Sequence, residues 1–535
     1  MSYLRRILGT FSRRASTWSQ PEGHDTGIQI YNCIAREKVP LIIKNKNCMT
    51  WYTCGPTVYD SAHVGHASCY VKIDIIQRIL RDHFKLNLIT AMNITDIDDK
   101  IINESKLRNQ SPLQIAKFYE KEYLEDLELL RVVRPNVVLR VTDNMSVILK
   151  FIKKLVDENH AYRTEDGSVY FDLKAYPHYG KLVAVNDPET AEKENSELKK
   201  NPNDFALWKA AKLNEPYWDS PFGSGRPGWH IECSALAGNL IGSTLDIHAG
   251  GKCLRISSSF SIFTRPFQGV DLKFPHHENE EAQSCAYFTK TQWVNYWLHT
   301  GQLRTKDAVK MSKSLKNTAS IRSMLQATTS DVFRVACLLS HYRSDMEYSS
   351  DLINNAATVL HGIKHFVDDC TVYLRGTTVQ SNVNNEVLLD HLGKTAADVH
   401  GALGDDFNTP AAMKSIQSLI TVTNSMLHNN AAPSSAATTT TVINHSVYIV
   451  AVLNFVVNTL DMFGVDLIHG RQADEGADDY SDIINVLIKF RQNVRGVGIV
   501  NKDESLLQYC DEVREELKRS GVYVKDHGRM SSWSR

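Results

Sequence analysis

The sequence predicts an α/β protein with a parallel sheet, followed by a helical region. Met49–Thr53 is rich in residues that favour strands, and Gly55-Pro56 ends that strand. From Val64 the apolar residues recur three to four positions apart, which indicates a helix, and Lys85–Met92 reads as the next strand. Strand, turn, helix and strand in that order are the start of a parallel α/β unit.

The next stretches predict an interruption of this unit. Residues 110–160 have apolar residues at helical spacing, whereas residues 165–225 are polar and irregular and read as an insertion. The α/β pattern resumes at Trp229. A literal G-x-G-x-x-G at Gly223–Gly228 follows a turn and not a strand, so we interpret it as a loop and not as a dinucleotide site.

The second half of the chain is predicted to be mainly helical. Residues 331–363 and 387–427 have the periodicity of bundle helices. The low-complexity stretch 429–441 indicates a loop between bundle helices, and 483–523 reads as helices with a short strand.

Composition limits the classes of function. A chain of 535 residues should hold three or four domains, and no apolar run approaches the roughly 20 residues of a membrane span. The net charge of -1 means that any contact with nucleic acid must come from local basic patches. The ten cysteines show no C-x-x-C spacing, which favours a reducing compartment over a disulfide framework.

The first twenty residues differ from the rest. They contain four arginines with serine and threonine, and no acidic residue occurs before Glu22. This composition is typical of a mitochondrial transit peptide, and a disordered basic tail is the alternative. The sequence therefore predicts location in the mitochondrial matrix.

Two short motifs suit the binding of anions. His63-Val64-Gly65-His66 stands at the turn from strand to helix, where backbone N–H groups and the helix dipole attract anions and the imidazoles can donate. Lys310-Met311-Ser312-Lys313-Ser314 places two lysines beside small hydroxyl residues, which suits developing phosphate charge. The chain has no G-x-x-x-x-G-K-[ST], so phosphate is not held by that motif.

These two motifs resemble the ATP signatures of class I aminoacyl-tRNA synthetases. Longer stretches resemble cysteinyl-tRNA synthetases in particular and, with the N-terminal segment, the mitochondrial form of that family. The stretches that carry this resemblance are Cys54–His66, Met92–Lys100, Phe205–Lys209, Gly228–Ser234 and Phe274–Glu280. The resemblance is strong over residues 28–350 and continues more weakly to the C-terminus.

The resemblance implies ATP-dependent attachment of L-cysteine to tRNA(Cys) through a cysteinyl-adenylate, with Mg²⁺ accompanying ATP. It implies a Rossmann-like catalytic domain with an inserted connective segment, a helical bundle and a C-terminal anticodon-binding module. The implied catalytic residues are His63, His66, Lys310 and Lys313. The implied ATP-binding residues are His63, Gly65, His66, Lys310, Met311, Ser312, Lys313 and Ser314.

A candidate metal site combines two cysteines, a histidine and a carboxylate. Cys54 and Cys233 are candidate thiolate ligands, and His276 and Glu280 are four residues apart at the expected start of a helix, on one face. Taken alone, each cysteine is more often a buried small hydrophobe, and a histidine and a glutamate four residues apart are more often an exposed helix pair. The resemblance implies that these four hold one zinc ion per chain. His277 and Glu278 are less favoured as ligands, because they lie off the face that His276 and Glu280 share.

Zinc would let such an enzyme distinguish cysteine from serine. A hydrophobic pocket separates near-isosteres by only about 10–200-fold. A coordinated thiol is deprotonated, whereas a serine hydroxyl is hard and far less acidic. The resemblance implies that the cysteine substrate is contacted by Cys54, Gly55, Thr57, Trp229 and His248, and Trp229 could also be plain core.

The domain boundaries follow from these stretches. We expect a transit peptide at 1–25, the first half of the catalytic domain at 26–125, a connective insertion at 126–225, the second half of the catalytic domain at 226–300, a stem-contact region with the two lysines at 301–335, a helical bundle at 336–475 and an anticodon-binding module at 476–535.

Residues 251–268 depart from the family pattern. Removing these eighteen residues restores that pattern, and the ends of the segment can be encoded by intron donor and acceptor sequences. We hypothesise a retained in-frame intron or an error in the gene model, and we expect the chain as written to be less active than one lacking the segment.

Two rival functions remain at this point. A ligase that passes activated cysteine to a small amine would not need the bundle or the C-terminal module. A non-catalytic RNA-binding relative would not need the histidine and lysine motifs. Three acidic residues, Asp96, Asp98 and Asp99, could suggest a second metal, but we favour a local structural or acceptor-stem role.

Overall fold

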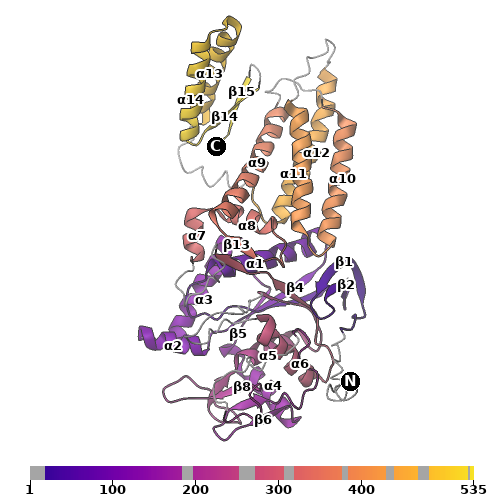
Figure 1. Ribbon diagram of the computed structural model, residues 1–535, viewed down its shortest axis with the longest axis vertical. Helices are drawn as coiled ribbons and strands as arrows, with labels where there is room; N and C mark the ends of the chain where they lie inside the picture. The colour runs from indigo at the N-terminus through magenta and orange to yellow at the C-terminus, as the bar shows by residue number, and fades with distance from the viewer. Residues whose placement is uncertain are drawn as a thin grey trace, which may run out of the picture. The chain divides into compact units, whose positions relative to one another are not determined.

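Figure 1 shows the computed structural model and labels its elements. The structure describes residues 18–183, 197–251, 272–305, 319–375, 383–428, 439–467, 481–527 and 530–534. The chain forms two compact units. Unit 1 is Met1–Met324 with Tyr342–Glu347, and unit 2 is Leu325–His341 with Tyr348–Arg535.

The centre of unit 1 is a five-stranded parallel sheet. Its strands are β3 (Met49–Thr53), β4 (Leu88–Ile94), β5 (Val137–Arg140), β10 (Leu245–Gly251) and β11 (Val294–Thr300). They lie in the order β11-β10-β3-β4-β5. The chain runs outward from β3 in one direction and from β10 in the other, so the order reverses between these two strands. Ligands of open α/β sheets bind beyond the carboxyl ends of the strands at such a reversal.

The helices of unit 1 connect these strands. The described ones are α1 (Val64–Arg78), α2 (Asp99–Arg108), α3 (Pro112–Leu129), α4 (Met145–Asp157), α5 (Trp229–Ile241) and α6 (Glu278–Phe288), with short helical turns at Ile79–His83, Thr142–Asn144 and Leu272–His277. Side chains start two of them: Asp98 accepts from the backbone of α2, and Ser111 forms a capping box with Gln114 at the start of α3.

Two sequence predictions in this region are corrected. The strand expected at Lys85–Met92 lies at Leu88–Ile94, and the stretch 110–160 is not helical throughout, because β5 lies within it. The four residues of β5 form an edge strand, which is too short for an alternating pattern to separate it from the helices on either side.

The region read as an irregular insertion contains most of an antiparallel sheet. Its strands are β6 (Ala161–Arg163), β7 (Val169–Phe171), β8 (Phe205–Ala210) and β9 (Gly225–Pro227), in that order. Phe171, Phe205 and Trp208 are buried there. Such short strands between polar loops give no period that sequence analysis can detect. An antiparallel hairpin of β1 (His24–Asn32) and β2 (Glu37–Ile43) was also not predicted.

Unit 2 is mainly helical. Its described helices are α8 (Ser330–Leu338), α9 (Ser350–Leu374), α10 (Asn385–Gly404), α11 (Thr409–His428), α12 (Thr439–Met462), α13 (Ser481–Asn501) and α14 (Glu504–Arg519). A hairpin of β14 (Tyr523–His527) and β15 (Met530–Ser534) follows. Along the chain, the division between the two units falls within the helix α7 (Ile321–Ala327) and within the strand β13 (Met346–Tyr348), which pairs with β12 (Leu303–Thr305) of unit 1. None of the described helices meets the length and apolarity of a membrane span.

A buried ion pair joins α13 to β14 in the C-terminal module, α13 to β15. The Arg491 side chain is 1% exposed and binds both carboxylate oxygens of Asp526, at 2.7 and 3.0 Å. Burial opposes ionisation of Asp526, but hydrogen bonds from Arg491 and Ser531 outweigh it and lower the pKa of Asp526 to about 2. This stabilisation is therefore complete above pH ~4, near the unfolded pKa of aspartate, and is lost as the pH falls towards 2.

We expect Asp526→Asn to destabilise this module by about 3 kcal/mol at pH 7, because it leaves a buried guanidinium unpaired. Urea unfolding followed by limited proteolysis of the module measures the change. The matched control is Asp511→Asn, since the side chain of Asp511 is 59% exposed and its pair with Arg514 lies at the surface. Equal stability of the two variants would contradict the prediction.

Candidate active site

The site begins where β3 ends, at the reversal of strand order. The backbone N–H of Cys54 donates to a β10 carbonyl at 3.2 Å, and the N–H of Gly55 donates to Asn93 Oδ1 at 2.8 Å. A Cβ at position 55 would lie 1.6 Å from the Asn93 carbonyl oxygen, so the backbone approaches closely enough to require glycine. Thr57 forms a parallel bridge with Thr95. This stretch is therefore held against the ends of both β10 and β4.

The two histidines of the first motif lie together at the start of α1. His63 is the N-cap residue, its N–H donates to His66 Nδ1 at 3.2 Å, and the two rings stack with centroids 3.9 Å apart. A Cβ at Gly65 would lie 2.8 Å from the His63 ring. Since a neutral His66 accepts at Nδ1, its Nε2 carries the ring hydrogen and can donate. The first turn of α1 contains no acidic residue, which favours an anion there.

The chain that follows the lysine motif pairs with this helix start. Ser320 forms an antiparallel bridge with His63, and the N–H of Val64 donates to Ala319 O at 3.1 Å. The lysine motif itself lies outside the described residues. Its members are Lys310, Met311, Ser312, Lys313 and Ser314.

The predicted metal ligands come together beneath the turn that follows β3. Cys54 and Cys233 have sulfurs 3.6 Å apart, and Cys54 Sγ lies 3.5 Å from Glu280 Oε1. His276 Nε2 lies 3.0 Å from the same oxygen. Tetrahedral zinc with ordinary bond lengths separates two sulfurs by about 3.8 Å and a sulfur from an oxygen by about 3.5 Å. The two distances from Cys54 Sγ match these values, and the ligand atoms of all four buried side chains lie within 4.8 Å of one another.

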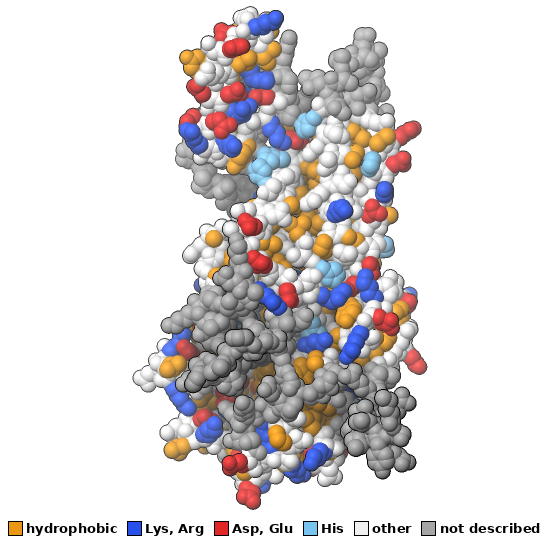
Figure 2. All heavy atoms as spheres, viewed as in Figure 1, with side chains coloured by type: hydrophobic (Ala, Val, Ile, Leu, Met, Phe, Trp, Pro, Cys, Tyr) orange, Lys and Arg blue, Asp and Glu red, His pale blue; other side chains and the backbone are white. Residues whose placement is uncertain are grey.

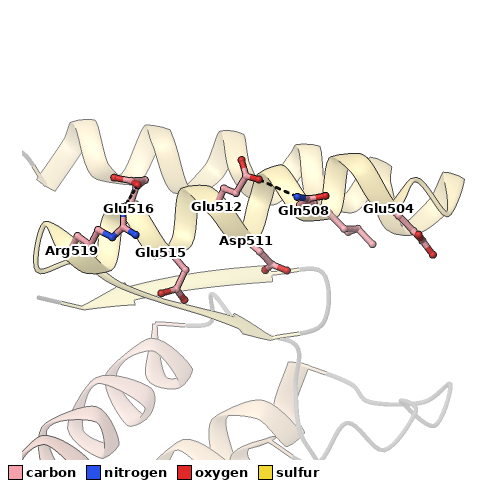
Figure 3. Close-up of a pocket in the computed structure, with 8 residues that line it drawn as sticks. Glu504, Gln508, Asp511, Glu512, Glu515, Glu516 and Arg519 are labelled. Carbon is pink, nitrogen blue, oxygen red and sulfur yellow. Dashed lines mark hydrogen bonds and ion pairs between the residues drawn. The ribbon is translucent and has the colours of Figure 1, made fainter.

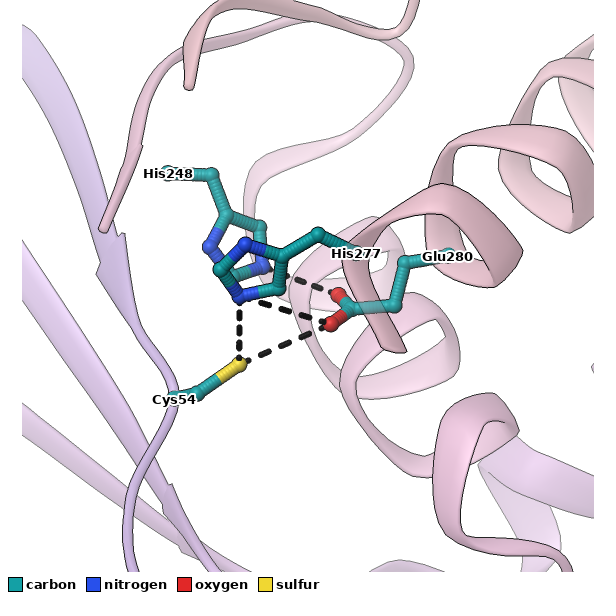
Figure 4. Close-up of side chains that lie close together, drawn as sticks. All are labelled: Cys54, His248, His277 and Glu280. Carbon is teal, nitrogen blue, oxygen red and sulfur yellow. Dashed lines mark hydrogen bonds and ion pairs between the residues drawn. The ribbon is translucent and has the colours of Figure 1, made fainter. Parts of the chain in front are cut away.

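A second group overlaps the first. Cys54, His248, His277 and Glu280 also lie close enough to share an ion, and Figure 4 shows their side chains pointing towards one another. His277 Nε2 lies 3.3 Å from Cys54 Sγ, and His248 Nε2 lies 2.8 Å from Glu280 Oε2. The first group suits zinc better, because it supplies two thiolates where the second supplies one.

The candidate ligands shift one another's pKa values. Burial disfavours a thiolate at Cys233, but a hydrogen bond from Cys54 and the nearby His276 outweigh it and lower the pKa of Cys233 to about 7. Burial, followed by Cys233, raises the pKa of Cys54 well above its usual value. Burial opposes the charge on His276, yet Glu280 and Cys233 raise its pKa to about 9. A metal bound here must displace protons from Cys54 and His276.

The predicted substrate residues surround this cluster. Trp229 begins α5, is half-buried, and stacks on the His276 ring with centroids 3.9 Å apart. His248 is fully buried in the middle of β10, stacked on Trp297 at 4.6 Å. Trp229 thus presents an aromatic face beside a candidate ligand, whereas His248 belongs to the second group and bonds to Glu280.

Sequence reasoning set His277 aside as a ligand and did not single out His230 or His299 for this site. His230 Nδ1 lies 2.9 Å from His276 Nδ1, and His277 bonds to both Cys54 and His299. The signal was present, because these residues stand at the start of α5, beside His276, and at the carboxyl end of β11. Only the strand order shows that these places meet.

The carboxylates of the Asp96–Asp99 stretch have protein partners. Asp96 accepts from the backbone of Thr142 at 3.0 Å, and Asp98 accepts from Lys100 N at the start of α2. Asp99 pairs with Lys209 at 2.8 Å and also with Arg226. These contacts agree with a structural role for the stretch.

Comparison with known proteins defines the class first. The model of the family described as "tRNA synthetases class I (C) catalytic domain" matches residues 41–358. Among solved structures, methionyl-tRNA synthetase of Mycobacterium tuberculosis has a TM-score of 0.54 at 14% identity, covering 79% of this chain and 91% of that chain. A putative arginyl-tRNA synthetase of Campylobacter jejuni has a TM-score of 0.52 at 10% identity, covering 80% and 94%. The fold is thus that of class I synthetases.

Closer relatives define the family. A probable mitochondrial cysteine–tRNA ligase of Xenopus tropicalis is 39% identical over 97% of this chain and 91% of its own length. A cytoplasmic cysteine–tRNA ligase of Dictyostelium discoideum is 36% identical, over 97% and 80%, and one of Methanococcus maripaludis is 35% identical, over 94% and 97%. The chain belongs to the cysteine–tRNA ligase family of class I aminoacyl-tRNA synthetases. The predicted family, enzyme class and fold class are confirmed.

Proposed function

We propose that this enzyme joins L-cysteine to tRNA(Cys) for mitochondrial translation, and that a zinc ion held by Cys54, Cys233, His276 and Glu280 selects the cysteine. The observation that carries the proposal is the buried cluster of these four side chains, whose ligand atoms lie within 4.8 Å of one another at the reversal of strand order. Membership of the cysteine–tRNA ligase family is the basis for the proposed reaction, and the sulfur-containing cluster is the basis for the proposed selection of cysteine.

The ATP site is proposed at the start of α1. The cysteine carboxylate attacks the α-phosphorus of ATP, the bond to pyrophosphate breaks, and cysteinyl-adenylate forms. His63 and His66, with the close backbone at Gly65, hold the triphosphate at the positive end of the helix. Lys310 and Lys313, with the small residues around them, are proposed to stabilise the pyrophosphate as it leaves, and Mg²⁺ to accompany ATP.

The amino-acid site is proposed beside the cluster. Zinc, when bound, supplies a soft Lewis acid that favours a deprotonated sulfur over a serine hydroxyl. Gly55 and Thr57 lie beside it on a stretch fixed against β4, and Trp229 covers one side of His276. His248 is proposed to orient Glu280 from below. Positioning and electrostatics carry the first step, and the 3′-terminal adenosine of the tRNA then attacks the adenylate.

We propose that the tRNA is bound by the stem-contact region at 301–335, the bundle at 336–475 and the module at 476–535. The outer face of α14 is a poor surface for a phosphate backbone, since Glu504, Asp511, Glu512, Glu515 and Glu516 line a shallow groove there (Figure 3). Figure 2 shows acidic and basic side chains mixed across the visible face. We therefore place the anticodon contacts on the other faces of the module.

The mitochondrial role rests on two observations. The first twenty residues have the composition of a transit peptide, and a relative 39% identical to this chain is named as mitochondrial. We propose that residues 1–25 direct the enzyme to the matrix. Those residues lie mostly outside the described part of the structure, and fusing them to a reporter protein tests the proposal.

Two assays test the function. We expect cysteine-dependent exchange of pyrophosphate into ATP. Serine should be at least about 1,000-fold less effective, because coordination of the side chain to a metal separates cysteine from serine better than the shape of a pocket does. We also expect charging of a tRNA(Cys) transcript. Exchange without charging of tRNA would instead support the ligase that acts on a small amine, and absence of both reactions would support the non-catalytic relative.

A further inference from the structure

Three of the four proposed zinc ligands, Cys54, His276 and Glu280, each contact a further histidine. His248 Nε2 lies 2.8 Å from Glu280 Oε2, His230 Nδ1 lies 2.9 Å from His276 Nδ1, and His277 Nε2 lies 3.3 Å from Cys54 Sγ. Such outer partners orient the ligands of metal sites and tune their basicity. Here all three partners are the same type of side chain, which calls for a reason.

The charge of the proposed centre supplies that reason. A zinc ion with two thiolates, one carboxylate and one neutral imidazole carries a net charge of -1, and the thiolate of a cysteine substrate would make it -2. Concentrated negative charge in a buried site is costly unless hydrogen-bond donors surround it. Among the described residues, no lysine or arginine lies within hydrogen-bond or ion-pair distance of the four ligand side chains. The histidine N–H groups are the donors that the fold provides.

His277 is the one whose hydrogen can be assigned. A coordinated thiolate only accepts, so His277 must carry its hydrogen on Nε2 to bond with Cys54. Its Nδ1 lies 2.8 Å from His299 Nε2, so in the neutral ring Nδ1 accepts and His299 donates. The ring also packs closely against the backbone of Gly250, where an added Cβ would lie 2.8 Å from His277 Cε1. His299 thus fixes the tautomer that points a donor at the sulfur.

We propose that His277, oriented by His299, is a positioning residue that determines specificity: its Nε2–H donates to the Cys54 thiolate and thereby lets an anionic centre accept the sulfur of the substrate. The inference rests on the proposed zinc site. It assigns to His277 a role outside the metal's own ligand set, and it predicts that cysteine binding and metal binding respond differently to its replacement.

The test compares His277→Leu with His277→Gln. Leucine removes the donor at similar bulk, whereas the amide of glutamine can place an N–H close to the position of Nε2. We expect His277→Leu to keep one zinc per chain, to weaken cysteine binding without ATP about 10–100-fold, and to leave KM for ATP unchanged. We expect His277→Gln to recover cysteine binding to within about fivefold of the wild type.

A second variant guards against a folding defect. His299→Leu is expected to weaken cysteine binding in the same direction by about 3–10-fold, because the tautomer of His277 is no longer fixed. Loss of zinc from folded His277→Leu would make His277 a ligand and overturn the inference, as would unchanged cysteine binding in both leucine variants. Absence of zinc from the wild-type protein would contradict the zinc proposal itself. If the wild type contains zinc and His277→Leu binds cysteine as tightly as the wild type does, only this inference is contradicted.

Discussion

Replacing Cys233 with serine is expected to remove zinc from the protein and to lower kcat/KM for cysteine in pyrophosphate exchange by at least about 1,000-fold, a loss of about 4 kcal/mol in transition-state stabilisation. The change removes one of the two soft ligands from a cluster whose sulfurs lie 3.6 Å apart. The serine hydroxyl is a hard donor that stays protonated near neutral pH. Metal analysis and steady-state kinetics on the same preparation measure both effects.

The matched control is Cys285→Ser. Cys285 is as buried as Cys233 and lies on α6, the helix that carries Glu280, but it belongs to neither metal group. We expect this variant to keep one zinc per chain and to lose less than about tenfold in kcat/KM, in line with a core substitution. Equal losses in the two variants would show that the effect of Cys233→Ser is one of packing.

Deleting Gly251–Gln268 is expected to raise the rate of tRNA charging per amount of purified protein at least about tenfold, because the segment inserts apolar residues just before the turn that carries His276, and uncovered apolar side chains favour aggregation. The segment joins β10, which carries His248, to the turn that carries His276. A Cβ at Gly250 would lie 3.0 Å from Leu272 Cδ1, so the two ends are in contact across the segment. The three residues left after the deletion are enough to connect them. Residues 252–271 lie outside the described part of the structure.

A second variant separates length from sequence in this test. Replacing residues 252–268 with glycine and serine keeps the loop length but removes the apolar side chains; because loop length costs little entropy, we expect it to be intermediate in activity. Charging rates of the deletion variant equal to those of the full chain would contradict the prediction. Sequencing of the spliced transcript decides the origin of the segment: mature reads that all contain it would refute a retained intron.

Much of the site could be predicted because its residues are local or chemically distinctive. His63 and His66 stand in one turn, and the spacing of His276 and Glu280 held even though His276 lies in the kinked turn before α6 and not in the helix. Cysteine is rare enough that Cys54 and Cys233, 179 residues apart, could be paired with help from the family resemblance.

The remainder could not be predicted because it depends on strand order. His299 lies at the end of β11 and His277 before α6, and they meet only because β11 lies beside β10. In the same way, the antiparallel strands within residues 165–225 pair across polar loops, so no local period marks them. Sequence patterns report which face of an element is buried, but they do not report which elements are neighbours.

The central claim is that zinc in the cluster of Cys54, Cys233, His276 and Glu280 recognises the substrate by its sulfur. Substituting Co²⁺ for zinc makes this visible, because sulfur bound to cobalt gives intense near-ultraviolet charge-transfer absorption. We predict one metal per chain, charge-transfer bands that increase when cysteine is added, and no change with serine. Absence of a bound metal in active protein, or identical spectra with cysteine and serine, would contradict the claim.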